Sequence, residues 1–439
     1  MSPEVSRSFL QCELKVGALP KTRKTDSKLV SVLQLICQQG KITRPRLTEL
    51  TGYSTFLVSK LCEKLMAAGL IAIMESDTSG GGRRPGLLSI DPGLGKLVGV
   101  DLGTVNVRIA LTDMNGGLLK YHKFPSNVHE GPDASLRRML DLIQLMLDQE
   151  KIGSRDLCGI GVGISAVLDR SMGTTRSWPK VPRWTNIPVR QIIHDHFKTV
   201  VEVDDSVRTA ALVERRVGGA SCARHFIYIN IGAGTGSALF LNNELYTGNA
   251  GFAGEFGHTT VDETGPPCSC GGRGCVEALA SGSAIIRTAK EGLLAGASTT
   301  LSEKCERDPK LLSAEVIAEA ARRQDRFCMN LLSRAGVDLG TAIVGLVNLL
   351  NPQLIVIGGG TALAAGDFFM DPIHRIVKER ALDVDLPEIR LSTLHDSDWA
   401  RGGAFLVMEK VVEAKLHASL KSTMHHTNEL SQSQHIVRQ

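Results

Sequence analysis

Two strand–turn–strand segments with glycine-rich turns constrain the fold of this chain most strongly. The segment GVDLGTVNVRIALTD begins at Gly99, and the segment NIGAGTGSALFLN begins at Asn230. Other apolar runs of strand length alternate with helical patterns over residues 133–150, 281–295 and 313–350. This alternation predicts an α/β fold, and the repeated hairpin predicts two lobes of related structure with a cleft between them.

The first fifth of the 439-residue chain has a different pattern, which predicts a separate domain. Residues 26–40 carry apolar side chains on one helical face, and Gly40 ends that helix. Thr43 and Ser54 can cap two further helices, which Gly52 separates. The strand-like segments LIAIMES and GLLSIDP then flank DTSGGGRRP, which would form a wing.

Residues 26–92 are therefore predicted to form a winged helix-turn-helix that binds double-stranded DNA, although a small three-helix packing unit would show the same spacing. Residues 1–92 hold 13 lysines and arginines against eight acidic residues. This excess suits a polyanionic partner but would also suit a solvated tail. The residues expected to contact DNA lie at the start of the second capped helix and in the wing: Thr55, Phe56, Ser59, Lys60, Arg83 and Arg84. Phe56 fits the core of the domain equally well.

The ends of the chain and its ten cysteines indicate where the protein works. Residues 1–25 form a basic lead-in and residues 417–439 a polar tail, and both are expected to be disordered. The sequence has no run of 18 apolar residues and no apolar signal segment, so neither secretion nor a membrane span is expected. Ten cysteines without an export signal indicate reduced thiols and a cytoplasmic location.

Several motifs resemble one known family. They are the two glycine-rich hairpins, GEFGH at residues 254–258, CSCGGRGCVE at 268–277 and NPQLIVIGGG at 351–360. Together they resemble the ROK family of sugar kinases and repressors, over a span from about Asp26 to about Met408. The segment GRRPGLLSIDP is similar to the repressor branch, which includes xylose and N-acetylglucosamine repressors.

The resemblance implies a two-lobed, actin-like ATPase fold of duplicated ribonuclease H-like type, preceded by the winged helix-turn-helix. The first lobe is expected at residues 97–224. The second lobe, with the cysteine-rich loop, is expected at residues 225–416, and the last helix is expected to return to the first lobe.

The segment GHTTVDETGPPCSCGGRGCVE, residues 257–277, is the candidate metal site. Three cysteines and one histidine are a soft ligand set that suits a closed, tetrahedral, structural Zn²⁺ site with one ion per chain. Cys268 and Cys270 are too close in sequence for an easy mutual disulfide. The family resemblance implies that His258 supplies the fourth ligand. The predicted zinc ligands are His258, Cys268, Cys270 and Cys275, and a disulfide or uninvolved thiols are the alternative.

Carboxylates on both sides of this segment are candidate effector ligands. Glu255 precedes His258 by three residues and Glu277 follows Cys275 by two, so a bound ion would hold both carboxylates at the cleft. The resemblance implies that they face sugar hydroxyls, which a carboxylate can accept in pairs. Exposed surface carboxylates are the alternative. The residues expected to bind a sugar or sugar derivative are Asn249, Glu255, His258, Glu277, Asp204, Asp205 and Lys180.

The phosphate-binding motif of the family's kinases is altered in this chain. A kinase hairpin of type DxGGT needs its second glycine for close approach to phosphate and its threonine hydroxyl for binding. This chain has DLGTVN, with Thr104 and Val105 at those two positions. The kinase string ENDANA is VDDSVR here, which keeps Asp205 as a vestigial base but places Asp204 and Val207 where asparagines are usual. No phosphoryl transfer is therefore expected.

The combined pattern predicts a DNA-binding transcriptional regulator, specifically a repressor of carbohydrate-metabolism genes. A sugar or sugar derivative in the cleft would close the lobes, and a homodimer or tetramer would pass that change to two recognition helices on an operator. Two alternatives stay open at this point. One is an ATP-dependent ROK sugar kinase that phosphorylates a hexose, and the other is a regulator controlled by a phosphotransferase protein.

Overall fold

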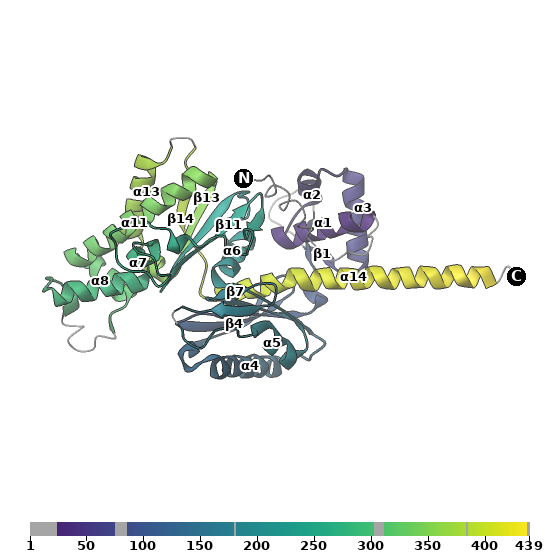
Figure 1. The fold of residues 1–439 in the computed structure, drawn as a ribbon. Helices are drawn as coiled ribbons and strands as arrows, with labels where there is room; N and C mark the ends of the chain where they lie inside the picture. Colours follow the sequence, from purple (N-terminus) through teal and green to yellow (C-terminus); the bar gives the residue numbers. More distant parts are fainter. Residues whose placement is uncertain (1–23, 75–85, 180, 303–310, 383–384, 437–439) are drawn as a thin grey trace, which may run out of the picture. The chain divides into compact units, whose positions relative to one another are not determined.

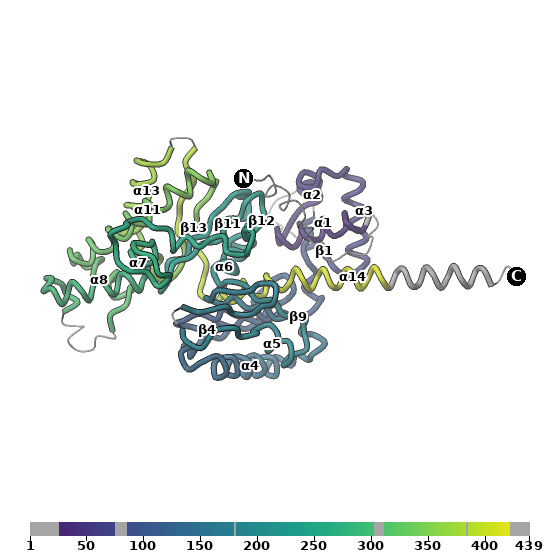
Figure 2. The backbone as a smooth tube through the Cα atoms, in the orientation of Figure 1, coloured from purple at the N-terminus to yellow at the C-terminus, as the bar shows by residue number. Residues whose placement is uncertain are grey.

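The computed structural model describes residues 24–74, 86–179, 181–302, 311–382 and 385–436 (Figures 1 and 2). The chain divides into two compact units. Within the described residues, the smaller unit contains the chain up to Cys37, Lys41–Ser89 and the chain from Leu416 onward. The larger unit contains Gln38–Gly40 and Ile90–Lys415.

The smaller unit consists of helices followed by a two-stranded sheet. Its elements are α1 (Lys24–Gln39), α2 (Arg44–Thr51), α3 (Thr55–Ala67), β1 (Ile71–Met74) and β2 (Leu87–Ile90), with β1 paired to β2. The predicted caps are confirmed, because the Thr43 hydroxyl accepts from the amide of Arg46 at 3.3 Å. The Ser54 hydroxyl accepts from the amide of Leu57 at the same distance. Gly52 ends α2 with a left-handed φ of 66°.

The core of this unit follows the predicted helical faces. The buried apolar residues include Leu29, Val32, Leu33, Ile36 and Cys37 on α1, and Val58, Leu61 and Leu65 on α3. The predicted wing, with Arg83 and Arg84, lies outside the described residues. Helix α1 begins at Lys24, and the rest of the predicted lead-in also lies outside the described residues.

The first half of the larger unit contains a five-stranded mixed sheet. Its strands are β3 (Lys96–Leu102), β4 (Asn106–Asp113), β5 (Leu118–Pro125), β6 (Leu157–Ile164) and β9 (Val200–Asp205), in the order β5-β4-β3-β6-β9. Strands β5, β4 and β3 are antiparallel neighbours, whereas β6 and β9 run parallel to β3. This half also contains η1 (Pro92–Leu94), η2 (Val128–Glu130), α4 (Pro132–Gln149), the pair β7 (Val167–Asp169) and β8 (Thr174–Ser177), and α5 (Val189–Phe197). Helices α4 and α5 cover one face of the sheet (Figure 1).

The second half repeats this topology. Its strands are β10 (Phe226–Ile231), β11 (Thr235–Leu241), β12 (Glu244–Tyr246), β13 (Leu354–Gly358) and β14 (Glu388–Leu391), in the order β12-β11-β10-β13-β14. Its helices are α7 (Val276–Ala280), α8 (Gly282–Leu294), α10 (Ala314–Arg322), α11 (Arg326–Leu350), α12 (Gly360–Ala365) and α13 (Asp367–Arg380). Three strands are again antiparallel, and β13 and β14 extend the sheet in parallel from β10. The α/β fold is therefore confirmed, together with the duplication predicted from the two hairpins.

Two helices lie at the junction of these halves, namely α6 (Ser206–Arg216) and α14 (Asp398–Ile436). Helix α14 packs backbone to backbone on the first sheet. A Cβ on Gly161 would lie 1.8 Å from the carbonyl oxygen of Gly403, and one on Gly99 would lie 2.0 Å from that of Ala400. The sheet can approach the helix this closely only because glycine occupies both positions.

The C-terminal segment differs from the expectation of disorder after residue 417. Helix α14 continues to Ile436. No glycine or proline follows Gly403 in the sequence, so nothing in this segment interrupts the helical hydrogen-bond pattern.

Among the described residues, one helix, α11, has the length and composition of a membrane span, and half of that stretch is buried within the protein. Gly336 and Gly340 of α11 lie close to α13, where an added Cβ would come within 3.0 Å of it. Helix α11 is therefore a core helix of the second half.

Candidate functional site

The four predicted metal ligands converge at one point in the second half. His258 ends the single turn η3 (Phe256–His258), and the three cysteines lie on the loop that leads to α7. All four ligand atoms lie within 4.8 Å of one another. His258 Nδ1 is 3.6 Å from Cys268 Sγ, and Cys270 Sγ is 3.7 Å from Cys275 Sγ. The thiols are too far apart for a disulfide of about 2.05 Å, and the spacing suits one ion with bonds of about 2.0–2.3 Å. The cluster can therefore hold a metal ion.

Glycine allows this loop to return to the same point. Gly271 and Gly274 have left-handed φ angles of 93° and 59°. A Cβ on Gly274 would lie 1.5 Å from the carbonyl oxygen of Asp262, so no other residue fits there. The amide of Gly274 donates to the carbonyl of Pro266 at 2.8 Å, which brings the following Cys275 back to the cluster.

A cavity of about 600 Å³ lies between the two halves of the larger unit. Residues at the carboxyl ends of β3, β6 and β9 line it from the first half, and the turn after β10 and the metal loop line it from the second. In α/β proteins, ligands bind at the carboxyl ends of the parallel strands. Five of the predicted effector ligands meet there: Asp204, Asp205, Glu255, His258 and Glu277. Asn249 is exposed and is not among the described residues that line the cavity, and Lys180 lies outside the described residues.

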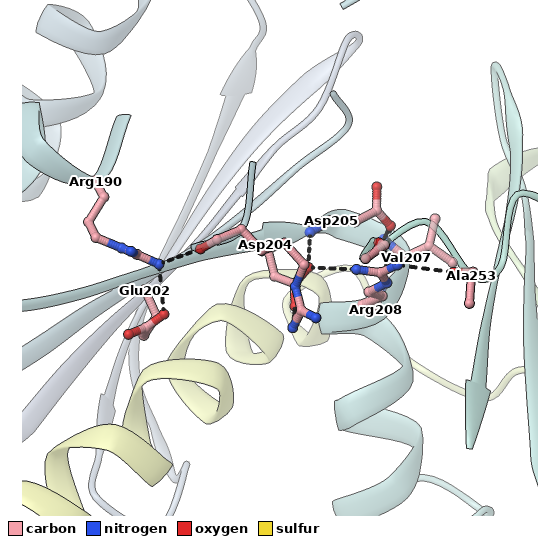
Figure 3. Close-up of polar contacts among 9 residues, drawn as sticks. Arg190, Glu202, Asp204, Asp205, Val207, Arg208 and Ala253 are labelled. Atoms are coloured by element: carbon pink, nitrogen blue, oxygen red, sulfur yellow. Dashed lines mark hydrogen bonds and ion pairs between the residues drawn. The ribbon is translucent and has the colours of Figure 1, made fainter. Parts of the chain in front are cut away.

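Asp204 is a buried carboxylate paired with two arginines that no motif had indicated. Its oxygens contact the guanidinium groups of Arg170 and Arg208, the latter at 3.3 Å. Arg208 Nη2 also donates to the carbonyl oxygen of Gly251 at 2.5 Å. The same nitrogen donates to the carbonyl oxygen of Ala253 at 3.0 Å (Figure 3). The signal in the sequence was VDDSVR itself, because a buried acid in place of an amide requires a cation nearby.

Asp205 caps helix α6 beside the cavity. Its carboxylate accepts from the amides of Val207 at 2.8 Å and Arg208 at 3.3 Å. Burial raises the pKa of Asp205 to about 7; the charge of Arg208 opposes this increase, and that of Asp204 adds to it. The carboxyl group can therefore gain or lose a proton near neutral pH while it holds the start of the helix.

Glu277 joins the metal loop to the glycine-rich turn between β10 and β11. It lies in the first turn of α7, two residues after Cys275. Its Oε2 accepts from the amide of Thr235 at 2.9 Å, and its Oε1 accepts from the hydroxyl of Ser269 at 3.4 Å. Ser269 also lines the cavity, although the cysteine spacing had marked only its two neighbours. The metal loop and the cavity thus share one carboxylate.

The cavity wall next to β3 contains ion pairs between side chains of the protein itself. Asp101 is buried against Arg108 at 2.6 Å, and Arg108 also pairs with Asp396 at 2.8 Å. Asp396 further accepts from the hydroxyl of Tyr121 at 2.7 Å and from the ammonium of Lys123 at 3.0 Å. Burial raises the pKa of Asp101 to about 6, against the effect of Arg108. A guanidinium is therefore already paired with two carboxylates at this wall.

Helix α3 presents the predicted DNA-contacting residues away from its core. Thr55, Phe56 and Lys60 are exposed and Ser59 is half-buried, while Val58 is buried on the other side. Because Phe56 is 76% exposed, the alternative that it belongs to the core is wrong.

Comparison with known proteins agrees with this architecture. The profile of the ROK family matches residues 97–410. The xylose repressor of Caldicellulosiruptor bescii is 28% identical over 80% of this chain and 87% of its own length. The glucokinase of Halalkalibacterium halodurans is 31% identical over 71% of this chain and 95% of its own length.

A solved structure provides a match to the fold. The crystal structure of a ROK-family transcriptional regulator, a homologue of the Escherichia coli Mlc protein, has a TM-score of 0.72 at 24% identity. The match covers 90% of this chain and 98% of that chain. Residues 1–96 make up more than a fifth of this chain, so a match of that extent includes part of the segment before the first sheet.

Proposed function

Because this chain belongs to the ROK family, we propose that it is a DNA-binding transcriptional repressor of carbohydrate-metabolism genes. A sugar or sugar derivative in the interlobe cavity would control it. The observation that carries this proposal is the wall next to β3, where Arg108 is paired with Asp101 and Asp396. Thr104 and the 63% exposed Val105 add side chains at the turn where a kinase needs glycine and a hydroxyl. A phosphate group would have to displace these groups, so the site suits sensing better than phosphoryl transfer.

The proposed DNA binding rests on the smaller unit. Two short helices joined at Gly52 and followed by a two-stranded sheet fit a winged helix-turn-helix. Helix α3 would enter the major groove of an operator, and the wing would contact its phosphates or the adjacent minor groove. The contacts would come from Thr55, Phe56, Ser59, Lys60, Arg83 and Arg84. A cytoplasmic homodimer or tetramer would present two such helices to two half-sites. The name of the xylose repressor among the relatives supports this role.

The proposed binding of an effector rests on the carboxylates at the cavity. Glu255, Glu277 and Asp205 would accept sugar hydroxyls beside His258, and Asp204 and Lys180 complete the proposed set. One structural zinc ion per chain would be held by His258, Cys268, Cys270 and Cys275. When bound, the ion would supply a fixed loop geometry, because four protein ligands leave no open coordination position.

The proposed DNA binding is tested by selecting binding sites from random duplexes with the full-length chain. The affinity for a selected site is then measured at several salt concentrations. Replacing Arg83 and Arg84 by alanine should weaken binding and reduce the salt slope by roughly two, because two fewer phosphate contacts release fewer counterions. The matched control replaces the adjacent pair Arg322 and Arg323 of the larger unit, and it should bind as the wild type does. Unchanged affinity and slope in the first variant would rule out the wing assignment.

A sugar kinase is the second candidate function. The glycine-rich turn with Gly232, Gly234 and Gly236 is intact, Asp205 is retained, and a glucokinase is among the relatives. ADP release is measured with ATP and glucose, xylose or N-acetylglucosamine. Sugar-dependent release would establish the kinase, and its absence at high enzyme concentration would support the regulator.

A further inference from the structure

Two arginines of the first half and one at the start of α6 reach one short loop of the second half. The loop, residues 247–254, connects β12 with the metal-site turn η3. Arg208 donates to the two carbonyl groups that flank Phe252 in the sequence. The guanidinium carbon of Arg176 lies 5.9 Å from the centre of the Phe252 ring, within range of a cation–π contact. A Cβ on Gly251 would lie 3.6 Å from Cδ of Arg170, so this side chain borders the loop as well.

Arg208 is built into this position. Its side chain is only 7% exposed, and a buried guanidinium is stable only when its charge is paired and its donors are used. Asp204 supplies the charge, and the two loop carbonyls accept from Nη2. Lysine could not reproduce this arrangement, because a single ammonium lacks the planar fork that spans both partners.

Asp204 orients arginines with both of its oxygens. Oδ1 accepts from Arg208 and from the amide of Asp205, and Oδ2 accepts from Arg170. Figure 3 shows Arg208 between Asp204 on the first half and Ala253 on the second. The carboxylate therefore acts on the loop through Arg208.

The second half holds the same loop from its other end. The amide of Ala253 donates to the carbonyl of Thr247 at 3.1 Å. The carbonyl of Gly254 accepts from the amide of Ser237 at 3.0 Å and from its hydroxyl at 2.9 Å. The backbone on both sides of Phe252 is thus fixed, and Phe252 lines the cavity with 36% of its surface exposed.

We propose that Phe252 contacts the effector and that Arg208 is the residue that positions it, with Asp204 acting through Arg208. This inference rests on the proposed sugar-binding function. A sugar ring has an apolar C–H face and a polar edge, so its site needs an apolar wall as well as hydrogen-bond acceptors. Phe252 supplies the wall, and Glu255 and Glu277 supply the acceptors. The effector class is therefore a ring-form sugar rather than an acyclic polyol.

The positioning role is tested without any ligand, by amide hydrogen exchange on the full-length chain. In Arg208→Gln, the amides of residues 247–254 should exchange roughly ten-fold faster or more, because charged hydrogen bonds to the loop are lost. Arg208→Lys should resemble Arg208→Gln. Arg322→Gln is the matched control, since Arg322 donates to the carbonyl of Ala364 at 2.8 Å elsewhere in the same unit. Loop exchange in Arg208→Gln equal to that of the wild type would overturn the positioning role.

The contact role is tested by calorimetric titration with glucose, xylose, N-acetylglucosamine and the acyclic xylitol. The wild type should bind at least one of the ring sugars more tightly than xylitol. Phe252→Ala should bind that sugar roughly ten-fold more weakly or worse, and Phe252→Tyr should retain the affinity. Arg208→Gln should show a similar loss of affinity. The Arg208→Gln/Phe252→Ala double variant should lose little more affinity than either single variant, because both changes remove the same apolar wall.

The outcomes separate the two proposals. A wild-type chain that binds none of these sugars contradicts the proposed function and the contact role of Phe252 together. Sugar binding that Phe252→Ala leaves unchanged contradicts the contact role alone. Fully additive losses in the double variant contradict the link between Arg208 and Phe252.

Discussion

Several of the side chains that line the interlobe cavity are charged, and some of them form ion pairs with one another within the protein. Asp204 pairs with Arg170 and Arg208, and Asp101 pairs with Arg108. Removing one partner of such a buried pair destabilises a protein by roughly 3–5 kcal/mol, because the other charge is left unpaired. Substitutions that keep the hydrogen bonds are therefore the informative ones at this site.

Asp205 offers such a substitution. Its pKa is about 7 in the folded chain and about 4 in an unfolded chain. At a pH between these two pKa values, Asp205 keeps a proton in the folded state that it has lost in the unfolded state. The free energy of unfolding therefore falls as pH rises through this range. Asn caps a helix as well as Asp does but does not titrate. Urea denaturation from about pH 5 to about pH 8 should show a steeper fall for the wild type than for Asp205→Asn. The elevated pKa of Asp101 is common to both proteins. Parallel profiles would contradict the raised pKa of Asp205.

The metal ligands could be predicted from the sequence because all four lie within 18 residues, from His258 to Cys275. The spacing and the glycines between them specify a loop that returns on itself. The contacts of Arg208 could not be predicted in the same way. Gly251 and Ala253 lie 43 and 45 residues from it, and only the packing of the two halves brings these groups together.

At the scale of whole elements, the packing of α14 on the first sheet depends on two glycines. In Gly161→Ala the added Cβ would meet the carbonyl oxygen of Gly403 at 1.8 Å, so the helix must shift. We expect a loss of roughly 3 kcal/mol or more in the free energy of unfolding. The control is Gly345→Ala in the exposed part of α11, where no atom lies within 4 Å of the new Cβ. It should stabilise the protein by up to about 1 kcal/mol. Equal midpoints for the two variants in chemical denaturation would refute the close packing.

The metal loop is the second element whose role can be measured. Protein purified without chelator should contain about one zinc ion per chain, and chelation should lower the melting temperature because the ion binds only the folded loop. Cys275→Ser should lose the metal, whereas Cys222→Ser, at an exposed cysteine outside the cluster, should retain it. Elemental analysis that finds no stoichiometric zinc in the wild type would refute the assignment.

Elements were predictable where their periodicity is local. The buried faces of α1 and α3 and the caps at Thr43 and Ser54 follow directly from the residue pattern. The extension of α14 to Ile436 was missed because the polar composition after residue 417 suggested a disordered tail. Composition indicates what a segment can bury, and it does not by itself end a helix that has already begun.

For the whole molecule, the proposed function means that the sugar site and the DNA site lie on different units and influence each other. The cavity is lined by residues of the larger unit, and the exposed face of α3 belongs to the smaller one. Linkage requires that a sugar which weakens DNA binding is itself bound more weakly when DNA is present. Variants at the cavity should therefore change the sugar concentration that is needed, and leave DNA affinity without sugar unchanged.

The most direct measurement of this central claim is operator binding by fluorescence anisotropy as glucose, xylose or N-acetylglucosamine is added, for the wild type and Glu255→Gln. At least one sugar should release the wild type from the operator. Glu255→Gln removes a charged acceptor worth roughly 1.5–3 kcal/mol, so it should need about ten- to a hundred-fold more of that sugar. Its operator affinity without sugar should match that of the wild type. Operator binding that none of these sugars changes, or identical response curves for the two proteins, would contradict the account.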